Sequence, residues 1–538
     1  MRATALQNSM AFNRRRLLRA GMTATKSLFW LGLMTLIGLV VGVMVVIMPP
    51  LAWIAVVALS IGMLLWVMPD LNLVPEDVMR RLFFFAVAVQ FAVPLYYAFA
   101  VPGLPWISIR RLTWFPMISV AALTLASSHL SRHRIAEIVG ETKLISIPAI
   151  GFLVSIFLSV LTSKAWTDSL RDASDAFLYW YMAFFGCLLC IRNEKDVRIV
   201  LKIICFLALL AGFAGITEYV LQRHFIAQFW PEAMIERLFA DNPYLFDNIV
   251  RNVIRNGQFR ANYIYNVSLS YGEFLAVCAP ICLYFSLRSR SWWEFALGCL
   301  GTLACVLGIF ASGSRGAYFG ASVAMPLVVS LWIIRYMKEN PSSLVGMIAT
   351  ATLVSFVSGF ATLAIFWARL RVLFTGGYEG AGSTDTRFAQ WELAKPWIIS
   401  NPITGHGAGL GGGLVGFYNP GSPIPSLDSY IISLLVEVGI PGFLFFFLMI
   451  GFSAILLLRV YILDSEEASS SAGAIACALV SFGLYRIALS QRENHVLLFL
   501  LVGMGMVVVF ASARRSLRPA VHSPRSAVDA SYRAMSTA

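Results

Sequence analysis

A single arginine stands among small residues where one apolar segment gives way to the next. The stretch is ASGSRGA, residues 311–317, and Arg315 is its only charged residue. A guanidinium group holds its donors in a planar fork that suits bidentate contact with a phosphate, and small neighbours leave an anion room to approach. The pattern indicates an anion site at Arg315. The alternative is an arginine that only reaches for the membrane interface.

Three further arginines, Arg251, Arg255 and Arg260, follow an aromatic-rich stretch that includes Phe229, Trp230 and Phe246. The aromatic residues suit a membrane interface, so we expect the amphipathic loop 221–267 to lie on the outer leaflet. Its arginines would hold either the phosphates of a lipid substrate or lipid headgroups.

A glycine-rich run, GHGAGLGGG, occupies residues 405–413. Gly407, Gly409 and Gly412 have the spacing of a dinucleotide fingerprint, but no strand precedes them, so a nucleotide cofactor is not indicated. Exposed backbone amides in such a run would let a phosphate or a sugar come close. A helical pattern with an apolar face that includes Trp391 opens at Thr386-Arg387 and precedes the run.

Three acids, Glu218, Glu273 and Glu437, lie in or near apolar segments. A charge at membrane depth is costly and is a functional candidate by default. Glu437 is predicted to act in a site or in a polar network. Glu218 and Glu273 have the same interpretation, with solvation at the outer interface as the alternative.

The elements that must position these residues are membrane helices. Hydrophobic residues make up 59% of the 538-residue chain, charged residues 13%, and the mean hydropathy is +0.76. No soluble core could bury that much apolar surface. The net charge of +13 is scattered between apolar segments, so nucleic acid is not an expected partner. Cys187 and Cys190 have metal-ligand spacing inside an apolar segment, where packing is the better interpretation, and no metal is expected.

The sequence therefore predicts an all-α polytopic integral membrane protein with about 12 to 14 transmembrane helices. The expected spans are 27–48, 51–68, 82–101, 112–128, 144–163, 177–192, 199–220, 268–287, 295–312, 316–335, 343–367, 429–458, 473–490 and 496–513. The short segment 51–68 has a re-entrant or interfacial piece as its alternative.

The distribution of lysine and arginine predicts cytoplasmic termini and two outward loops, because short cytoplasmic loops hold the positive excess. The expected parts are a basic cytoplasmic N-terminus (1–26), an N-terminal bundle (27–220), a periplasmic amphipathic loop (221–267), helices carrying the SRGA motif (268–367), a large periplasmic loop (368–428), C-terminal helices (429–513) and a disordered cytoplasmic tail (514–538). The first apolar run is expected to be a retained signal anchor, since no small-residue cleavage site follows it.

Taken in order, the motifs resemble the O-antigen ligase and polysaccharide polymerase (Wzy_C) superfamily. They are S-R-G-A, then R-x-x-x-W, then N-P-I-T-G-x-G-x-G, then S-Y-x-x-x-L-L-x-E-x-G-I-P-G, and the resemblance covers about 260–450. It implies a GT-C-like architecture in the bacterial inner membrane. It also implies transfer of a glycan from a polyprenyl diphosphate carrier to a hydroxyl acceptor at the periplasmic face, without metal, nucleotide or other cofactor.

The resemblance assigns Arg315 and Arg387 to the carrier diphosphate, because the leaving diphosphate gains charge that fixed cations stabilise. Arg260, from the amphipathic loop, is a further candidate for the diphosphate. Glu437, Trp391, Tyr430, Gly405 and Gly407 are expected to support the site.

The chain departs from the ligase pattern at the proposed base. Ligases that act on lipid A core have His-Asn where this chain has Asp428, in SLDSY. Asp428 is therefore the favoured proton acceptor and His406 the second candidate, while a helix N-cap is the structural alternative for Asp428.

This departure favours a polymerase of lipid-linked repeat units, which makes exopolysaccharide or O-antigen, over a ligase that uses lipid A core as its acceptor. A transporter of lipid-linked oligosaccharides is the alternative from another class. Membrane lipids and, through the resemblance, flippase and export or chain-length proteins are the expected partners.

Overall fold

The structure is a computed structural model that describes residues 62–63, 75–99, 107–240, 243–250, 254–255, 258–366, 377–418, 425–464, 470–487 and 490–517. The chain divides into two compact units, of which the larger comprises residues 74–121 and 130–538. All the contacts discussed below lie within this larger unit. The predicted N-terminus (1–26), the spans 27–48 and 51–68, the side chains of Arg251 and Arg255, and residues 518–538 of the predicted tail lie outside the described residues.

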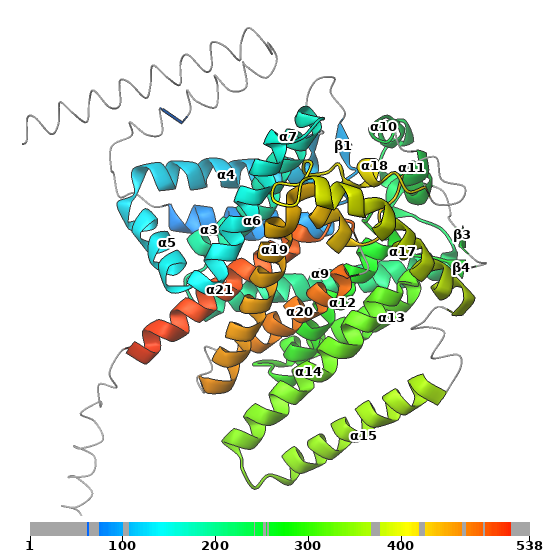
Figure 1. Cartoon of the computed structure of the whole chain (residues 1–538). Coiled ribbons are helices and arrows are strands. Elements are labelled where there is room, and N and C mark those ends of the chain that lie inside the picture. The colour runs from blue at the N-terminus through cyan, green and yellow to red at the C-terminus, as the bar shows by residue number, and fades with distance from the viewer. Residues whose placement is uncertain are drawn as a thin grey trace, which may run out of the picture. The chain divides into compact units, whose positions relative to one another are not determined.

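Helices form almost all of the described chain (Figure 1). They are α3 (Glu76–Ala92), α4 (Ile109–Ser127), α5 (His129–Glu141), α6 (Lys143–Leu161), α7 (Trp166–Asp175), the π-helix η1 (Ala176–Tyr181), α8 (Met182–Cys190), α9 (Glu194–Leu221), the 3₁₀-helix η2 (Ile226–Phe229), α10 (Glu232–Leu238), α11 (Pro243–Val250), α12 (Ser268–Leu287), α13 (Trp292–Ser312), α14 (Arg315–Glu339), α15 (Leu344–Phe366), α17 (Gly377–Ser400), α18 (Gly411–Val415), α19 (Tyr430–Leu463), α20 (Ser471–Arg486) and α21 (His495–Leu517).

The described strands are two short antiparallel pairs. β1 (Ala98–Phe99) pairs with β2 (Ile107–Ser108), and Ala98 lies opposite Ser108. β3 (Ile254–Arg255) pairs with β4 (Gln258–Phe259), and Ile254 lies opposite Phe259.

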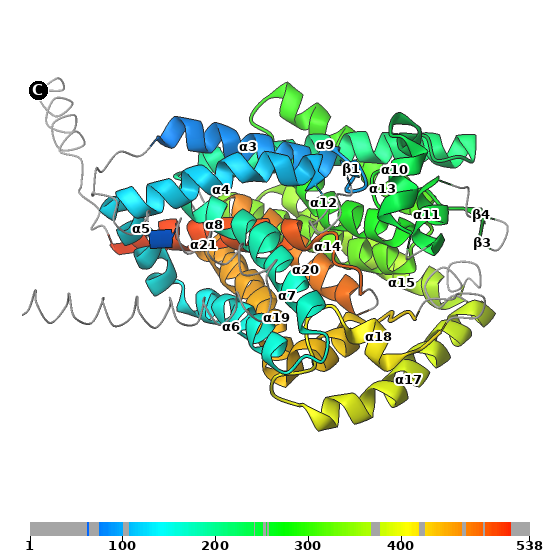
Figure 2. The same ribbon diagram turned by 90° about the horizontal axis from the view of Figure 1, so that it is seen from above.

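Helix α12 lies at the centre of one group of helices and packs against α9, α13, α14 and α20 (Figures 1 and 2). Small residues allow this close packing, as is usual between membrane helices. A Cβ at Gly298 of α13 would lie 2.4 Å from the Ser286 amide nitrogen of α12. A second group forms around α19, which packs against α6, α17, α20 and α21.

Within the described ranges, eight helical segments are long and apolar enough to cross a membrane, and the predicted all-α polytopic membrane fold is confirmed. They are Lys143–Leu161, Trp166–Cys190, Glu194–Leu221, Ser268–Leu287, Trp292–Ser312, Arg315–Glu339, Tyr430–Leu463 and His495–Arg515. Two shorter apolar helices, Leu344–Gly359 and Ser471–Arg486, match two further predicted spans. Many large apolar side chains on these helices are exposed, which fits a surface in contact with lipid.

Three features of the helices differ from the sequence-based expectation. The predicted span 82–101 is interrupted, because α3 ends at Ala92, two residues before Pro94, and the chain then forms β1. The polar helix α5 lies between two predicted spans and was not anticipated. Helix α17 begins at Gly377, before the predicted start at Thr386, and continues through Pro396 to Ser400.

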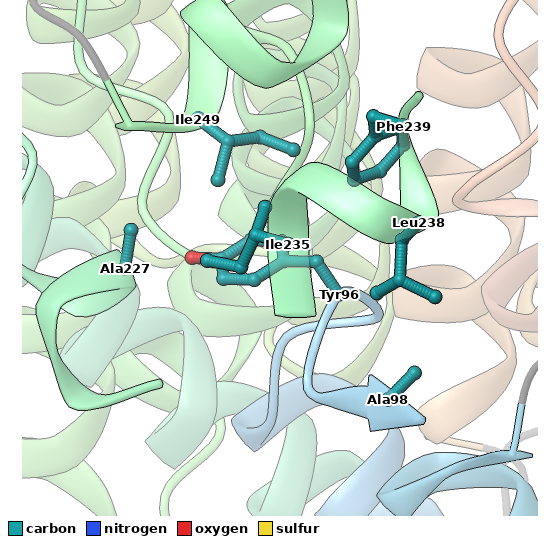
Figure 3. Close-up of a cluster of buried hydrophobic side chains, with 7 residues drawn as sticks. All are labelled: Tyr96, Ala98, Ala227, Ile235, Leu238, Phe239 and Ile249. Atoms are coloured by element: carbon teal, nitrogen blue, oxygen red, sulfur yellow. The ribbon is translucent and has the colours of Figure 1, made fainter. Parts of the chain in front are cut away.

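The first predicted loop folds onto the protein (Figure 3). Tyr96 and Ala98 pack with side chains of α10 and its neighbours, and Phe246 packs against this cluster. The Trp230 ring stacks on Tyr97 with 5.0 Å between centroids. Trp230 and Phe246 are therefore half-buried against the protein, and the expectation that they anchor the loop in the outer leaflet stays a prediction. Phe229 is exposed, as anticipated.

Candidate functional site

Helix α19 is broken near its N-terminal end, and the break creates two backbone acceptors. Gly439 has φ of 71° and ψ of −177°, and Pro441 follows it. Proline has no N–H, so the carbonyl of Glu437, four residues earlier, loses its helical donor. The Ile440 amide turns away from the helix and donates to Pro402 O at 2.8 Å, which leaves the Val436 carbonyl without its helical donor.

The glycine-rich loop fills this break. The amide of His406 donates to Val436 O at 2.9 Å, and the amide of Gly407 donates to Glu437 O at 3.0 Å. Gly405 has φ of +68°, and a Cβ there would lie 2.4 Å from the Glu437 carbonyl carbon. Glycine is needed because the loop backbone touches the helix backbone. The motif N-P-I-T-G-x-G and the motif E-x-G-I-P-G therefore form one backbone joint.

The Glu437 carboxylate holds the next turn of the same loop. Its Oε2 accepts from the Gly409 amide at 3.0 Å, and its Oε1 accepts from the Gly411 amide at 3.2 Å. The Ser433 hydroxyl donates to Oε1 at 2.8 Å. Glu437 therefore forms a polar network, as the sequence suggested, and its charge orders the loop amides.

Arg492, in the segment between α20 and α21, balances this charge. Its NH2 lies 2.9 Å from Glu437 Oε2, and its NH1 lies 3.2 Å from Asp172 Oδ2 on α7. Burial alone would lower the pKa of Arg492, but Glu437 and Asp172 outweigh burial and raise it above its ordinary value. A Cβ at Gly409 would lie only 1.6 Å from Asp172 Oδ2. We call Glu437, Arg492 and Asp172 the carboxylate clamp.

Helix α17 joins the start of α19 through a buried glutamine. Gln390 Oε1 accepts the Asp428 amide at 3.0 Å, and its amide nitrogen lies 3.4 Å from Ser426 O. Arg387 lies one turn before Gln390, and its Nε is buried without a hydrogen-bond partner in the described part of the chain. Trp391 packs against the apolar cluster that joins α17, α18 and α19.

Asp428 itself is half-buried and precedes the helix boundary. The N-cap residue of α19 is Ser429, and no side chain caps the helix. The N-cap alternative for Asp428 is therefore wrong. Its carboxylate accepts no hydrogen bond from the residues that the structure describes. No described donor therefore competes with a hydroxyl group for the carboxylate oxygens.

The other candidate base, His406, is bound within the protein. Its Nε2 lies 2.8 Å from Trp397 O and 3.0 Å from Ser400 Oγ, and the side chain is buried. Through these contacts the His406 ring fixes the end of α17 against the glycine-rich loop. Tyr430 is also buried, and its hydroxyl lies 2.8 Å from His495 Nε2.

Arg315 begins α14, next to Arg260. A Cβ at Gly313 would lie 3.2 Å from Arg260 Nε, so the Arg260 side chain covers the turn that leads into Arg315. The neighbouring Ser314 hydroxyl is hydrogen-bonded to the Tyr485 hydroxyl near the end of α20. The two arginines therefore share one helix junction, which is tied to the segment that carries Arg492.

A second buried network lies beside this segment. Arg486 and Glu273 form an ion pair with no solvent exposure, and Asn494 donates to Glu273 Oε2 at 2.8 Å. Glu218 is also fully buried and accepts the amides of Asn262 and Tyr263 at 3.1 and 3.0 Å. The solvated interpretation of Glu218 and Glu273 is wrong, because protein donors replace water at both.

Sequence reasoning missed Asp172, Arg486, Arg492 and Asn494. For Arg492 and Asn494 the available signal was SQRENH, residues 490–495, a run of polar residues between two apolar helices. Its Glu493 is half-buried, and the loss of solvation raises the pKa of its carboxyl, although the Asn266 amide donates to Oε1 at 3.2 Å.

No curated protein matches the chain. Residues 300–447 match the family model described as O-antigen ligase, a range that contains Arg315, Arg387, the glycine-rich loop and the break in α19. This match supports the resemblance of that part of the chain to the O-antigen ligase and polysaccharide polymerase superfamily.

Proposed function

We propose that this protein is a bacterial inner-membrane glycosyltransferase that polymerises polyprenyl-diphosphate-linked repeat units at the periplasmic face. The family match supports membrane glycan transfer of the ligase or polymerase kind. The choice of a polymerase rests on Asp428, which stands where ligases acting on lipid A core have histidine.

In the proposed reaction, an acceptor hydroxyl attacks the anomeric carbon of the carrier-linked glycan. The bond from that carbon to the diphosphate oxygen breaks, and its electron pair leaves with the diphosphate. Arg387 and Arg315, with Arg260, stabilise the added charge, and Asp428 takes the hydroxyl proton. The protein needs no further group for this exchange, because the carrier diphosphate is the leaving group.

One observation supports the proposal most strongly, namely the two hydrogen bonds of Gln390. They fix Asp428 and Ser426 against α17, one turn from Arg387. A proton acceptor and a cation for the leaving group are thereby held on adjoining elements, and positioning of this kind is a large part of catalysis.

A ligase is the second candidate, because the matching family model is described as O-antigen ligase. It would transfer finished chains to lipid A core. The two activities leave different intermediates, so one experiment distinguishes them.

The test is glycan chain length on gels from a strain lacking the gene and carrying wild type, Arg387→Ala, Asp428→Asn or the control Lys395→Gln. Lys395 lies on the same helix with an exposed side chain and serves as the matched control. We expect Arg387→Ala and Asp428→Asn to lower long-chain glycan by about a hundredfold or more, with single repeat units left on the carrier. Protein levels are compared by blotting.

Long chains left on the carrier and absent from lipid A core would identify a ligase instead. Substrate retained on the cytoplasmic side would identify a transporter. Normal chains from both site variants would refute the assignment of Arg387 and Asp428.

A further inference from the structure

A polar cavity of about 250 Å³ lies beside the carboxylate clamp. It is formed by α7, the start of α4 and the segments around β1 and β2. Its lining residues are Leu95, Ser108, Arg111, Asp168, Arg171, Asp172 and Asp175. None of the residues assigned to the carrier diphosphate lines it, so the cavity is a separate feature of the protein.

Part of the lining is held rigidly. Arg111 NH2 lies 2.7 Å from Asp175 Oδ2, and the Arg111 guanidinium lies over the Tyr179 ring, 5.0 Å from its centroid. Asp172 is fixed from the other side by Arg492. A wall with fixed charged groups recognises a ligand at lower entropic cost than a mobile one.

The rest of the lining is available to a ligand. Asp168 and Arg171 are exposed, and neither makes a hydrogen bond or an ion pair with any residue that the structure describes. They stand three residues apart on α7, so they lie on the same face of the helix. One offers acceptors and the other offers donors to the same cavity.

The charge of the lining restricts the class of ligand. Three carboxylates disfavour a phosphate or diphosphate, whereas two guanidinium groups disfavour a divalent cation. A neutral ring with many hydroxyls suits both kinds of group, because carboxylates accept hydroxyl protons and guanidinium groups donate to hydroxyl oxygens. The volume suits a ligand of about one sugar ring, below the usual range for larger ligands.

The cavity is linked to the candidate site through one residue. Asp172 lines the cavity, pairs with Arg492, and occupies the space left by the missing side chain of Gly409. Arg492 in turn pairs with Glu437, which holds the glycine-rich loop. A ring bound in the cavity would therefore lie next to the loop that precedes Asp428.

We propose that this cavity is a sugar subsite that binds one uncharged ring of the glycan substrate. This inference rests on the proposed function, because it names a part of that reaction's substrate. The ring belongs either to the acceptor or to the donor glycan, and both have the same hydroxyl chemistry.

The test uses the full chain in lipid nanodiscs and two probes. The first is the host's repeat-unit oligosaccharide released from its carrier by mild acid, which has no phosphate. The second is polyprenyl diphosphate without sugar. Dissociation constants are measured for wild type, Asp168→Asn, Arg171→Gln, Arg387→Ala and the control Lys164→Gln, which is exposed near α7 and does not line the cavity.

We expect Asp168→Asn and Arg171→Gln each to weaken oligosaccharide binding about tenfold or more, because each removes a charged hydrogen-bonding group. Binding of the sugar-free carrier should stay within about twofold of wild type in these two variants, whereas Arg387→Ala should show the reverse pattern. Lys164→Gln should bind both probes as wild type does. Binding that is lost when the ring at the non-reducing end of the oligosaccharide is removed assigns the bound ring to the acceptor, and binding that is lost when the reducing-end ring is removed assigns it to the donor.

Cavity variants that bind the oligosaccharide like Lys164→Gln would overturn the subsite, as would a wild type that does not bind it. In either case, a selective loss of carrier binding in Arg387→Ala would leave the proposed function standing. A wild type that binds neither probe and makes no long chains in the complementation experiment would overturn both.

Discussion

The ion pair between Glu437 and Arg492 offers the sharpest test of how the site is held together. The Glu437 side chain is 5% exposed and that of Arg492 is 26% exposed. Glu437→Gln keeps the shape and one acceptor oxygen but removes the charge. Its new amide hydrogens then face the donors of Gly409, Gly411 or Arg492.

The expected cost follows from these contacts. Removing one partner of a buried pair costs about 3–5 kcal/mol. Asp172 still compensates part of the Arg492 charge, and the glutamine oxygen still accepts one hydrogen bond. We therefore expect Glu437→Gln to lower the free energy of unfolding by about 2–3 kcal/mol.

The assay is a double-mutant cycle with Arg492→Gln in detergent micelles, with unfolding driven by a denaturing detergent and followed by tryptophan fluorescence. We expect a coupling energy of about 2 kcal/mol. The exposed pair Glu392 and Lys395, at 2.6 Å, is the matched control and should couple by less than about 1 kcal/mol. A coupling between Glu437 and Arg492 no larger than in this control would refute the reasoning.

Two further predictions concern the same region. Gly409→Ala should lower the free energy of unfolding by about 1–3 kcal/mol or more, because Gly409 has φ of +84° and Asp172 fills the space for a side chain. The control Gly413→Ala, which has open space around it, should change the free energy of unfolding little. Equal effects of the two substitutions would contradict the packing of the loop on α7. Because burial raises the pKa of Glu493, the folded state holds its proton more tightly than the unfolded chain, so stability should fall as pH rises from about 4.5 through the raised pKa. Glu493→Gln should remove this part of the fall in Tm between about pH 4 and pH 8, and parallel Tm curves for the two proteins would count against it.

The helices could be predicted because each span carries its own apolar signal. The runs that become α6, α9, α13 and α21 are long enough to identify without any knowledge of their neighbours. The end of α3 was missed because a proline in an apolar run is compatible with either a kinked span or a stop. The covering of Trp230 was missed because its partner, Tyr97, lies far away in the sequence.

The candidate site could be predicted only where one stretch of chain carries the signal. Glycines 405 and 407 and the motif around Glu437 are visible in the sequence, but their mutual hydrogen bonds are not. The contact between Asp172 and Arg492 spans 320 positions, and no local pattern connects these residues. Long-range charge pairing is decided by how the helices assemble, and hydropathy does not report it.

The carboxylate clamp also sets an order of assembly. Asp172 and Glu437 are synthesised well before Arg492, which lies in the last described interhelical segment. Chains generally fold from the N-terminus during synthesis, so the two acids and the loop amides must wait for their counter-charge. The glycine-rich loop therefore acquires its final form only when α21 joins the bundle, and the candidate site is completed as one of the last events of the protein's biogenesis.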